Sequence, residues 1–167
     1  MSNTPTLHRR QRVRKSTTSI LGTVLCALLL SSCSKIDYHT TAGESGRFID
    51  GKTWFLINYW AEWCKPCIEE IPELNRMQTL NTSRVRVFAV NYDGAQGNAL
   101  LQQIAKLGIA VPTLLEDPAP KLGFQKPDAL PTTFVFSPDG TLRQTLQGPQ
   151  TVASLTAAIE AATGNKP

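Results

Sequence analysis

The feature that most constrains the fold is a pair of cysteines placed between a strand pattern and a helix pattern. The run 53–60 is apolar, aromatic and β-branched, which is typical of a short buried strand. Cys64 and Cys67 follow it directly, and from about residue 66 to 80 apolar side chains recur every three residues. That recurrence predicts one buried face of a helix, interrupted by Pro72. Both thiols should therefore lie where a strand ends and a helix begins.

This position changes the chemistry of the first thiol. Unpaired backbone N–H groups and the helix dipole favour a thiolate at Cys64, and Lys65 adds a nearby positive charge. The thiolate is the attacking species in disulfide exchange, and Cys67, about one turn later, can resolve the mixed disulfide. Pro66 between them suits a first helical turn, where no backbone donor is needed.

Two other uses of the cysteine pair fit the sequence less well. A purely stabilising disulfide that closes so short a ring would constrain the unfolded chain very little. Half of a metal site would need further Cys or His ligands, and beyond the N-terminal leader the chain offers only His39. Neither a metal site nor a hydrolytic centre built on histidine is therefore expected.

The first 34 residues have the layout of an export signal. They hold five of the 17 basic residues and none of the 13 acidic ones. Their cationic start precedes an apolar run from about Ile20 to Leu30, which is shorter than the roughly 20 residues of a spanning helix. The remaining chain has 12 basic and 13 acidic residues, so the formal charge of +4 indicates no nucleic-acid partner.

Cys33 closes this leader in the motif Leu-Ser-Ser-Cys33, which resembles the bacterial lipobox. The resemblance implies a lipoprotein signal peptide over 1–33, an acylated Cys33 and an anchor in the lipid bilayer. Ser34 follows, and because an aspartate there is associated with inner-membrane retention, it favours the outer membrane. Cleavage that leaves Cys33 as a free thiol and a twin-arginine export route are the alternatives. With Cys26 in the discarded part, only the pair at 64 and 67 keeps free thiols.

The remainder of the chain predicts a tether and one α/β domain. Residues 34–49 are polar and aperiodic, which indicates a flexible tether, and residues 50–165 hold the regular elements. The alternation of strand and helix patterns is that of an α/β layer fold. Strands are expected at 53–60, 84–92, 111–115, 132–136 and 141–146, helices at 66–80, 98–107 and 151–162, and a single turn at 120–124.

A resemblance to a known family is carried by the cysteine pair and its flanks. Asn58-Tyr-Trp-Ala-Glu-Trp-Cys-Lys-Pro-Cys67 and the following Ile68-Glu-Glu-Ile-Pro-Glu-Leu74 resemble the active-site strand and helix of the thioredoxin superfamily. They are most similar to the exported ResA/TlpA-like thiol–disulfide reductases, over about residues 50–163. The resemblance implies a thioredoxin-like fold, a central mixed β-sheet flanked by helices, with the helix and strand insertion of this branch between residues 98 and 115.

The same resemblance implies a docking surface beside Cys64. The segment Leu130-Pro-Thr-Thr-Phe134 is similar to the one that carries the family's cis-proline, so the bond before Pro131 is expected to be cis. From the sequence alone, Pro131 would be an ordinary proline that opens a strand. Trp60 is expected to pack in the core. The expected substrate-binding residues are Trp63, Pro66, Leu130, Pro131 and Gly148.

One departure from thioredoxins concerns proton transfer. Where they carry a buried aspartate before the first cysteine, this chain has Asn58, which cannot carry a proton at neutral pH. ResA-like proteins carry a glutamate implicated in thiol reactivity at the position of Glu70, which lies on the same helix side as Cys67. Glu70 is therefore a candidate catalytic residue together with the two cysteines. The alternative is that Glu69, Glu70 and Glu73 form a solvated acidic face.

The resemblance implies an enzyme, a thiol–disulfide oxidoreductase of the protein-disulfide reductase type, with no cofactor beyond its own disulfide. Its expected partners are protein thiols and disulfides and a membrane thiol electron donor, and it is expected to act as a monomer on the periplasmic side of the cell envelope. A disulfide oxidant or isomerase, and a non-catalytic anchored chaperone or assembly factor, are the alternatives. In the family, cytochrome c maturation, rescue of oxidised envelope proteins and thiol delivery for metal-centre assembly all use this scaffold.

Overall fold

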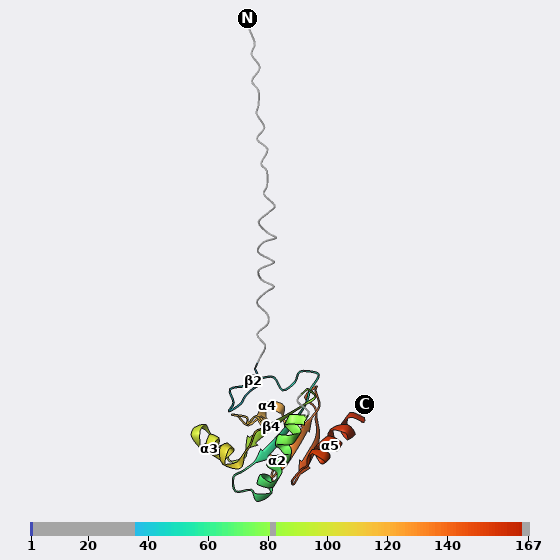
Figure 1. Ribbon diagram of the computed structural model, residues 1–167. Coiled ribbons are helices and arrows are strands. Elements are labelled where there is room, and N and C mark those ends of the chain that lie inside the picture. Colours follow the sequence, from blue (N-terminus) through green and yellow to red (C-terminus); the bar gives the residue numbers. More distant parts are fainter. Residues whose placement is uncertain (2–35, 81–82, 165–167) are drawn as a thin grey trace. The chain divides into compact units, whose positions relative to one another are not determined.

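A four-stranded mixed sheet lies at the centre of the computed structural model, which describes Met1 and residues 36–80 and 83–164. Its strands are β3 (Trp54–Trp60), β4 (Val85–Asn91), β5 (Thr132–Phe136) and β6 (Leu142–Gln147). Their order across the sheet is β4-β3-β5-β6 (Figure 1). β3 and β4 are parallel, whereas β5 is antiparallel to both β3 and β6. The predicted mixed sheet is confirmed.

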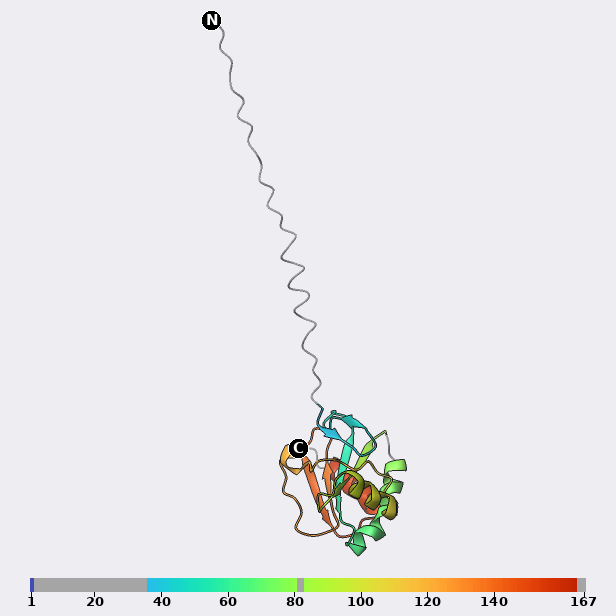
Figure 2. The same cartoon turned by 90° about the vertical axis from the view of Figure 1, so that its left-hand side faces the viewer.

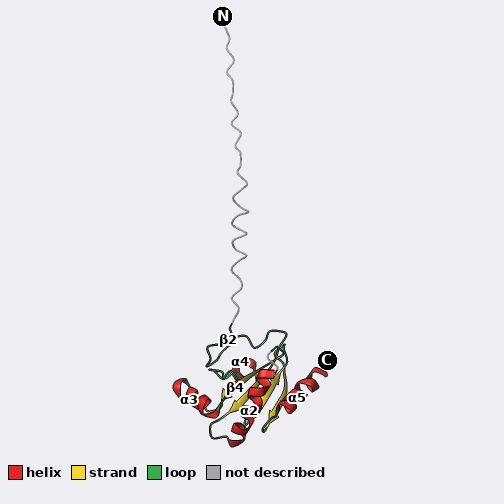
Figure 3. Ribbon diagram, viewed as in Figure 1, coloured by secondary structure: helices red, strands yellow, loops and turns green. Residues whose placement is uncertain are grey.

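Helices connect these strands and cover the sheet (Figure 3). They are α2 (Lys65–Leu80), α3 (Gly97–Leu107), the single turn α4 (Ala119–Leu122) and α5 (Val152–Gly164). All four lie within two residues of the predicted ranges, and Pro72 is inside α2 as expected. α2 leads from β3 to β4, which makes the parallel pair possible because a parallel connection needs a crossover.

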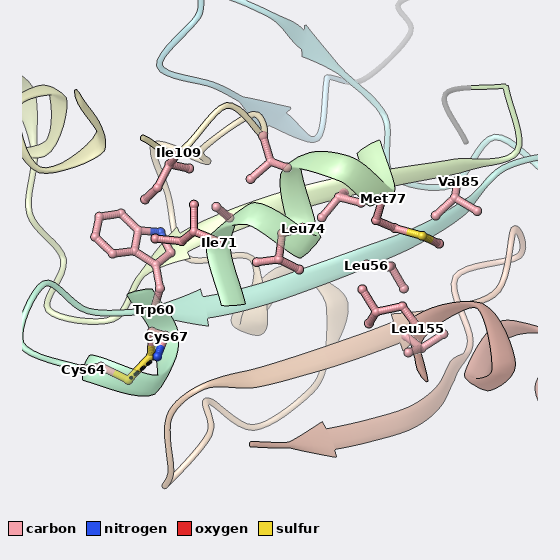
Figure 4. Packing of buried hydrophobic residues seen from close by; sticks show 14 of the residues in the cluster. Leu56, Trp60, Cys64, Cys67, Ile71, Leu74, Met77, Val85, Ile109 and Leu155 are labelled. Carbon is pink, nitrogen blue, oxygen red and sulfur yellow. Dashed lines mark hydrogen bonds between the residues drawn. A yellow bond between two sulfur atoms is a disulfide. The ribbon is translucent and has the colours of Figure 1, made fainter. Parts of the chain in front are cut away.

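The two faces of the sheet carry two different cores. Alternation along β3 sends Leu56 to one face and Phe55 and Ile57 to the other. The first core is largely aliphatic and packs α2 and α5 against the sheet (Figure 4). The second core is largely aromatic, and α4 and the N-terminal part of the described fold adjoin it. Each large side chain buried in this way contributes about 1.5–3 kcal/mol, so the sheet is held from both sides.

The expected tether at 34–49 is wrong for the residues that the structure describes. A small hairpin forms there from β1 (Tyr38–His39) and β2 (Ser45–Gly46). Phe48 is buried and contacts Tyr38, Phe88 and Phe55 at ring-centroid distances of 4.9, 5.4 and 5.6 Å. Two-residue strands are too short to leave a period in the sequence, and the aromatic contacts rather than any pattern hold this segment.

Arg86 of β4 fastens the same segment to the sheet. Its guanidinium donates hydrogen bonds to the carbonyls of Arg47 at 2.9 Å and Phe48 at 2.6 Å. The carboxylate of Asp50 lies 3.7 Å from the same group. Figure 2, turned from Figure 1, shows the hairpin beside the sheet, so the folded domain begins well before the predicted residue 50.

The expected strand at 111–115 is reduced to isolated bridges. Thr113 pairs in parallel with Ala89 of β4, and Leu114 pairs with Thr40 in the antiparallel sense. These contacts lie along the outer edge of β4, whose backbone groups would otherwise be open to other chains. The helix of the predicted insertion is therefore confirmed as α3, and its strand is present only as this edge cover.

The predictions for the leader lie outside the residues that the structure describes. They concern the signal peptide 1–33 and the acylation of Cys33, and they stay predictions. Among the described residues, no helix is both long and apolar enough to cross a membrane.

Candidate active site at Cys64 and Cys67

Cys64 and Cys67 form a disulfide at the first turn of α2, with their Cα atoms 5.3 Å apart. The chain turns from β3 into the helix where Cys64 N–H donates to the carbonyl of Ala61 at 3.1 Å. The N–H groups of Cys67 and Ile68 then donate to the carbonyl of Cys64 at 3.0 and 3.2 Å. The predicted placement of both thiols between strand and helix is confirmed (Figure 4).

The backbone around Cys64 is arranged to stabilise negative charge on sulfur. The N–H of Cys67, which donates to the Cys64 carbonyl, also points to Sγ of Cys64 at 3.3 Å, and the first helical turn carries the positive end of the helix dipole. Lys65 adds less than its charge suggests, because its side chain is largely solvated and lies 4.0 Å from the Glu69 carboxylate. The helix terminus is therefore the main source of thiolate stabilisation.

Both cysteines are mostly covered in the disulfide form, Cys64 at 4% and Cys67 at 1% exposure. Solvent-accessible side chains surround the disulfide on its outer side. Trp63 is 67% exposed, and its indole N–H donates to the Asp93 carboxylate at 2.9 Å. Pro66 is exposed as well. Trp60, by contrast, is buried among Ile71 and Ile109 (Figure 4), as its predicted core role requires.

The proline segment that precedes β5 lies beside this turn. The Leu130–Pro131 peptide bond is cis, as the resemblance implied. Because Thr132 pairs with Tyr59, the antiparallel register places Pro131 next to the end of β3. Leu130 packs against the core cluster that contains both cysteines. Gly148, with a φ of +83° that suits glycine, donates its N–H to the Pro131 carbonyl at 2.9 Å. The structure thus brings these three predicted residues to one edge of the site.

Glu70, one helical turn after Cys67 on α2, is buried at 2% exposure. Its carboxylate accepts hydrogen bonds from the Asn58 side-chain amide and from the backbone N–H of Gln150, both at 3.1 Å. Burial raises the pKa of Glu70 to about 7, against the opposite effect of these two hydrogen bonds. The solvated-face alternative is therefore wrong for Glu70. It does describe Glu69, whose side chain is 63% exposed.

Asn58 takes the place of an acid in this pocket, and it links two strands. Its amide also donates to the hydroxyl of Thr133 on β5 at 2.9 Å, so it holds Glu70 and Thr133 together. An amide in this position fixes the geometry without adding a second buried charge, which would be costly beside a carboxylate. Glu70 is thus the group in this pocket that can take up or release a proton near neutral pH.

Sequence reasoning missed three groups that shape the site. Asp93 binds the indole of Trp63, Gln150 binds Glu70 through its backbone, and Glu73 binds the N–H of Val152. Each contact joins segments at least 30 residues apart. No local pattern in the sequence marks such pairs.

Residues 39–145 match the model of the AhpC/TSA family, which is more than half of the chain. The chain belongs to the AhpC/TSA family. This family member is similar in sequence to the thiol–disulfide oxidoreductase ResA of Geobacillus kaustophilus, at 30% identity over 112 residues. It is also similar to the thiol:disulfide interchange protein HelX of Rhodobacter capsulatus, at 34% identity over 116 residues. The likeness to ResA expected from the cysteine motif is confirmed.

The similarity spans only part of each of these relatives. The matches cover 65% and 66% of this chain, and 63% of ResA and 61% of HelX, so each spans less than two thirds of the relative. Among solved structures, StoA from Bacillus subtilis superimposes with a TM-score of 0.62 at 21% identity, over 75% of this chain and 97% of StoA. That likeness confirms the thioredoxin-like fold.

Proposed function

We propose that this chain is a thiol–disulfide oxidoreductase that reduces disulfides of extracytoplasmic proteins. The observation that carries the proposal is the Cys64–Cys67 disulfide at the start of α2, beside the Leu130–Pro131 backbone. ResA is a thiol–disulfide oxidoreductase and HelX a thiol:disulfide interchange protein, which supports the same reaction class here. No cofactor beyond this disulfide is needed, because both electrons are carried by the two sulfurs.

The reaction consists of two exchanges. In the reduced chain, the Cys64 thiolate attacks one sulfur of a substrate disulfide, and the other substrate sulfur leaves as a thiolate. This gives a mixed disulfide between Cys64 and the substrate. Cys67 then loses its proton and attacks Sγ of Cys64, which forms the internal disulfide and releases the second substrate thiolate. The substrate gains two electrons, the chain loses two, and a dithiol donor must restore them.

Glu70 is the proton acceptor in the second exchange. It lies one helical turn after Cys67 and is the carboxylate held by Asn58. With a pKa of about 7, Glu70 is partly deprotonated at neutral pH, so it can accept a proton when Cys67 becomes the nucleophile and return it later. A solvated glutamate would be too weak a base for this step.

The location and partners form part of the same proposal. The leader supports export, and Cys33 supports a lipid anchor that holds the chain on the periplasmic side of a membrane, with the outer membrane favoured by Ser34. A membrane thiol donor would recharge Cys64 and Cys67. Protein thiols and disulfides would be the substrates, and the chain would act as a monomer.

The proposal is tested by insulin reduction with dithiothreitol as the electron source. Catalysed turnover should fall on the order of a thousandfold or more in Cys64→Ser, as expected when a nucleophile is removed. Cys67→Ser should instead accumulate a mixed disulfide on Cys64, and mass spectrometry of proteins trapped in the cell envelope would identify the substrates. A chaperone would keep its effect on insulin aggregation in Cys64→Ser, and that result would contradict the proposal.

A further inference from the structure

The segment Gly148–Val152, here called the strap, joins β6 to α5 and is fastened to the site at three points. Its Gly148 N–H donates to the carbonyl of Pro131 at 2.9 Å. The N–H of Gln150 donates to Glu70 at 3.1 Å, and the N–H of Val152 donates to Glu73 at 2.9 Å. Two glutamates of α2, one turn apart, therefore hold a segment whose other end supports the proline backbone beside the disulfide.

The two glutamates stand in different environments. Glu70 is buried and its proton affinity is altered, as described above. Glu73 has 26% of its side chain exposed and lies 3.3 Å from the guanidinium of Arg76. Glu73 therefore contacts the strap through the Val152 N–H and its own helix through Arg76.

Helix α5 does not need Glu73 to begin. Its N-terminus carries a cap of its own, because the Thr151 hydroxyl accepts from the N–H of Ser154 at 3.1 Å and the Ser154 hydroxyl accepts from the N–H of Thr151 at 2.9 Å. Such reciprocal bonds already satisfy backbone donors at a helix start. What Glu73 adds is a link between this start and α2, the helix that carries the cysteines.

Through the strap, a movement of the start of α5 can reach Pro131 and Gly148, here called the docking edge. The side-chain amide of Gln150 donates to the carbonyl of Gly148 at 2.9 Å, and its side-chain oxygen accepts from the Ser154 hydroxyl at 2.9 Å, so Gln150 links Gly148 to the first turn of α5. A shift of Val152 away from α2 would therefore move Gly148, and with it the hydrogen bond to Pro131.

We propose that Glu73 is a positioning residue that sets the docking edge at Pro131 and Gly148 by holding the strap against α2. This inference rests on the proposed function, because the edge matters only when a protein substrate lies along it. Glu73 touches neither the reacting sulfurs nor the substrate. It should affect how well a protein substrate is held, and leave the intrinsic reactivity of the disulfide unchanged.

The test compares three variants in insulin reduction and in the direct reduction of the Cys64–Cys67 disulfide by dithiothreitol. Glu73→Ala should raise the KM for insulin about five- to tenfold, the factor that the loss of one hydrogen bond of ordinary strength can produce. Its rate with dithiothreitol should stay at the wild-type value. Glu73→Gln, which keeps an oxygen to accept the Val152 N–H, should remain within about twofold of wild type.

Ala158→Gly is the matched control, because it weakens α5 in its interior and leaves the contacts of Glu73 and of the strap intact. It should lower stability without changing KM. Equal increases of KM in Ala158→Gly and Glu73→Ala would overturn the proposal, since helix stability alone would then explain both. An unchanged KM in Glu73→Ala, with wild-type turnover normal, would overturn it as well.

A readout without turnover keeps this test separate from the proposed function. Hydrogen exchange of the Gly148 amide reports its bond to Pro131 directly, whether or not insulin is a substrate. That amide should exchange faster in Glu73→Ala and at the wild-type rate in Ala158→Gly. Unaltered exchange in Glu73→Ala would contradict the positioning role, whereas faster exchange in a chain that never reduces insulin would contradict only the enzymatic proposal.

Discussion

The outer and inner sides of the Cys64–Cys67 disulfide differ in the residues that form them and in their exposure to solvent. On the outer side, Trp63 and Pro66 are exposed and face solvent. On the inner side, Asn58 and Glu70 are buried, and both carboxylate oxygens of Glu70 and the amide nitrogen of Asn58 have a hydrogen-bond partner. The outer side offers apolar surface to another protein, and the inner side offers a proton site that solvent does not reach.

This difference indicates that the two sides of the disulfide serve different steps of the proposed reaction. Substrate recognition needs surface that is accessible and tolerant of many partners, because protein disulfides differ in their neighbours. Proton transfer needs a group whose pKa is set by its surroundings, and burial of Glu70 provides that. Replacements on the two sides should therefore change different quantities, and the predictions below separate them.

The largest effect is expected from a matched pair of tryptophans. Trp60→Ala removes a fully buried ring and should lower the free energy of unfolding by about 3–5 kcal/mol. Trp63→Ala removes an exposed ring and should leave that free energy almost unchanged, while the KM for insulin rises several-fold because apolar contact with the substrate is lost. Urea denaturation and steady-state kinetics measure the two quantities.

The opposite result for the two tryptophans would contradict the assignment of an outer recognition side and an inner structural side. If Trp63→Ala destabilised the fold as much as Trp60→Ala, the outer side would be structural, and its bond to Asp93 would be the reason. Asp93→Asn, which keeps an oxygen acceptor for the indole, serves as the control for that bond.

A smaller effect, on the pH dependence of the free energy of unfolding, is expected from Glu70→Gln. It is measured in the oxidised protein, whose cysteines do not titrate. The folded-state pKa of Glu70 is raised to about 7 from an ordinary 4.5, so the folded chain binds the proton more tightly than the unfolded one. Wild-type stability should therefore be fullest below pH 4.5 and fall by roughly 3 kcal/mol as the pH rises to 7. Glu70→Gln should lack this fall.

The measurement is urea denaturation of both chains across that pH range, compared as a difference so that other titrating groups cancel. Glu69→Gln is the control, because Glu69 occupies the neighbouring position on α2 and is solvated. A wild-type curve parallel to that of Glu70→Gln would show that Glu70 titrates as an ordinary surface acid, and the inner side would lose its proton site.

The sequence predicts the centre of this molecule well because the centre has strong local patterns. The run 53–60 and the helix that follows it combine a buried strand, a spaced cysteine pair and an apolar stripe, and each of these is visible within a few residues. The position of the thiols at the helix start follows directly. The cis bond before Pro131, by contrast, was predictable only through the family resemblance.

The hairpin at residues 38–46 shows the opposite case. Its strands are two residues long, so they have no period, and its stability depends on Phe48 and Arg86, which meet only in the folded state. The polar composition that suggested a tether describes the turn of the hairpin correctly. It gives no information about a single phenylalanine that is buried against an aromatic core.

The inner side of the site lies between these two cases. Three glutamates stand close together on α2, and the sequence marks all of them as candidates for an acidic face. Only the packing of the segment Gly148–Val152 against the helix separates buried Glu70 from solvated Glu69 and from Glu73, which binds Val152. Those contacts span about half the chain, which is why sequence reasoning alone could not assign the roles.

The most direct test of the account is the titration of the two thiols in the reduced protein. Site-resolved labelling with iodoacetamide at a series of pH values, read by mass spectrometry, gives a separate pKa for Cys64 and Cys67. Cys64 should have a pKa below the ordinary value of about 8.5 and be labelled first, because it lies at the start of α2. A Cys64 pKa at or above that value, with labelling no faster than at Cys67, would contradict it.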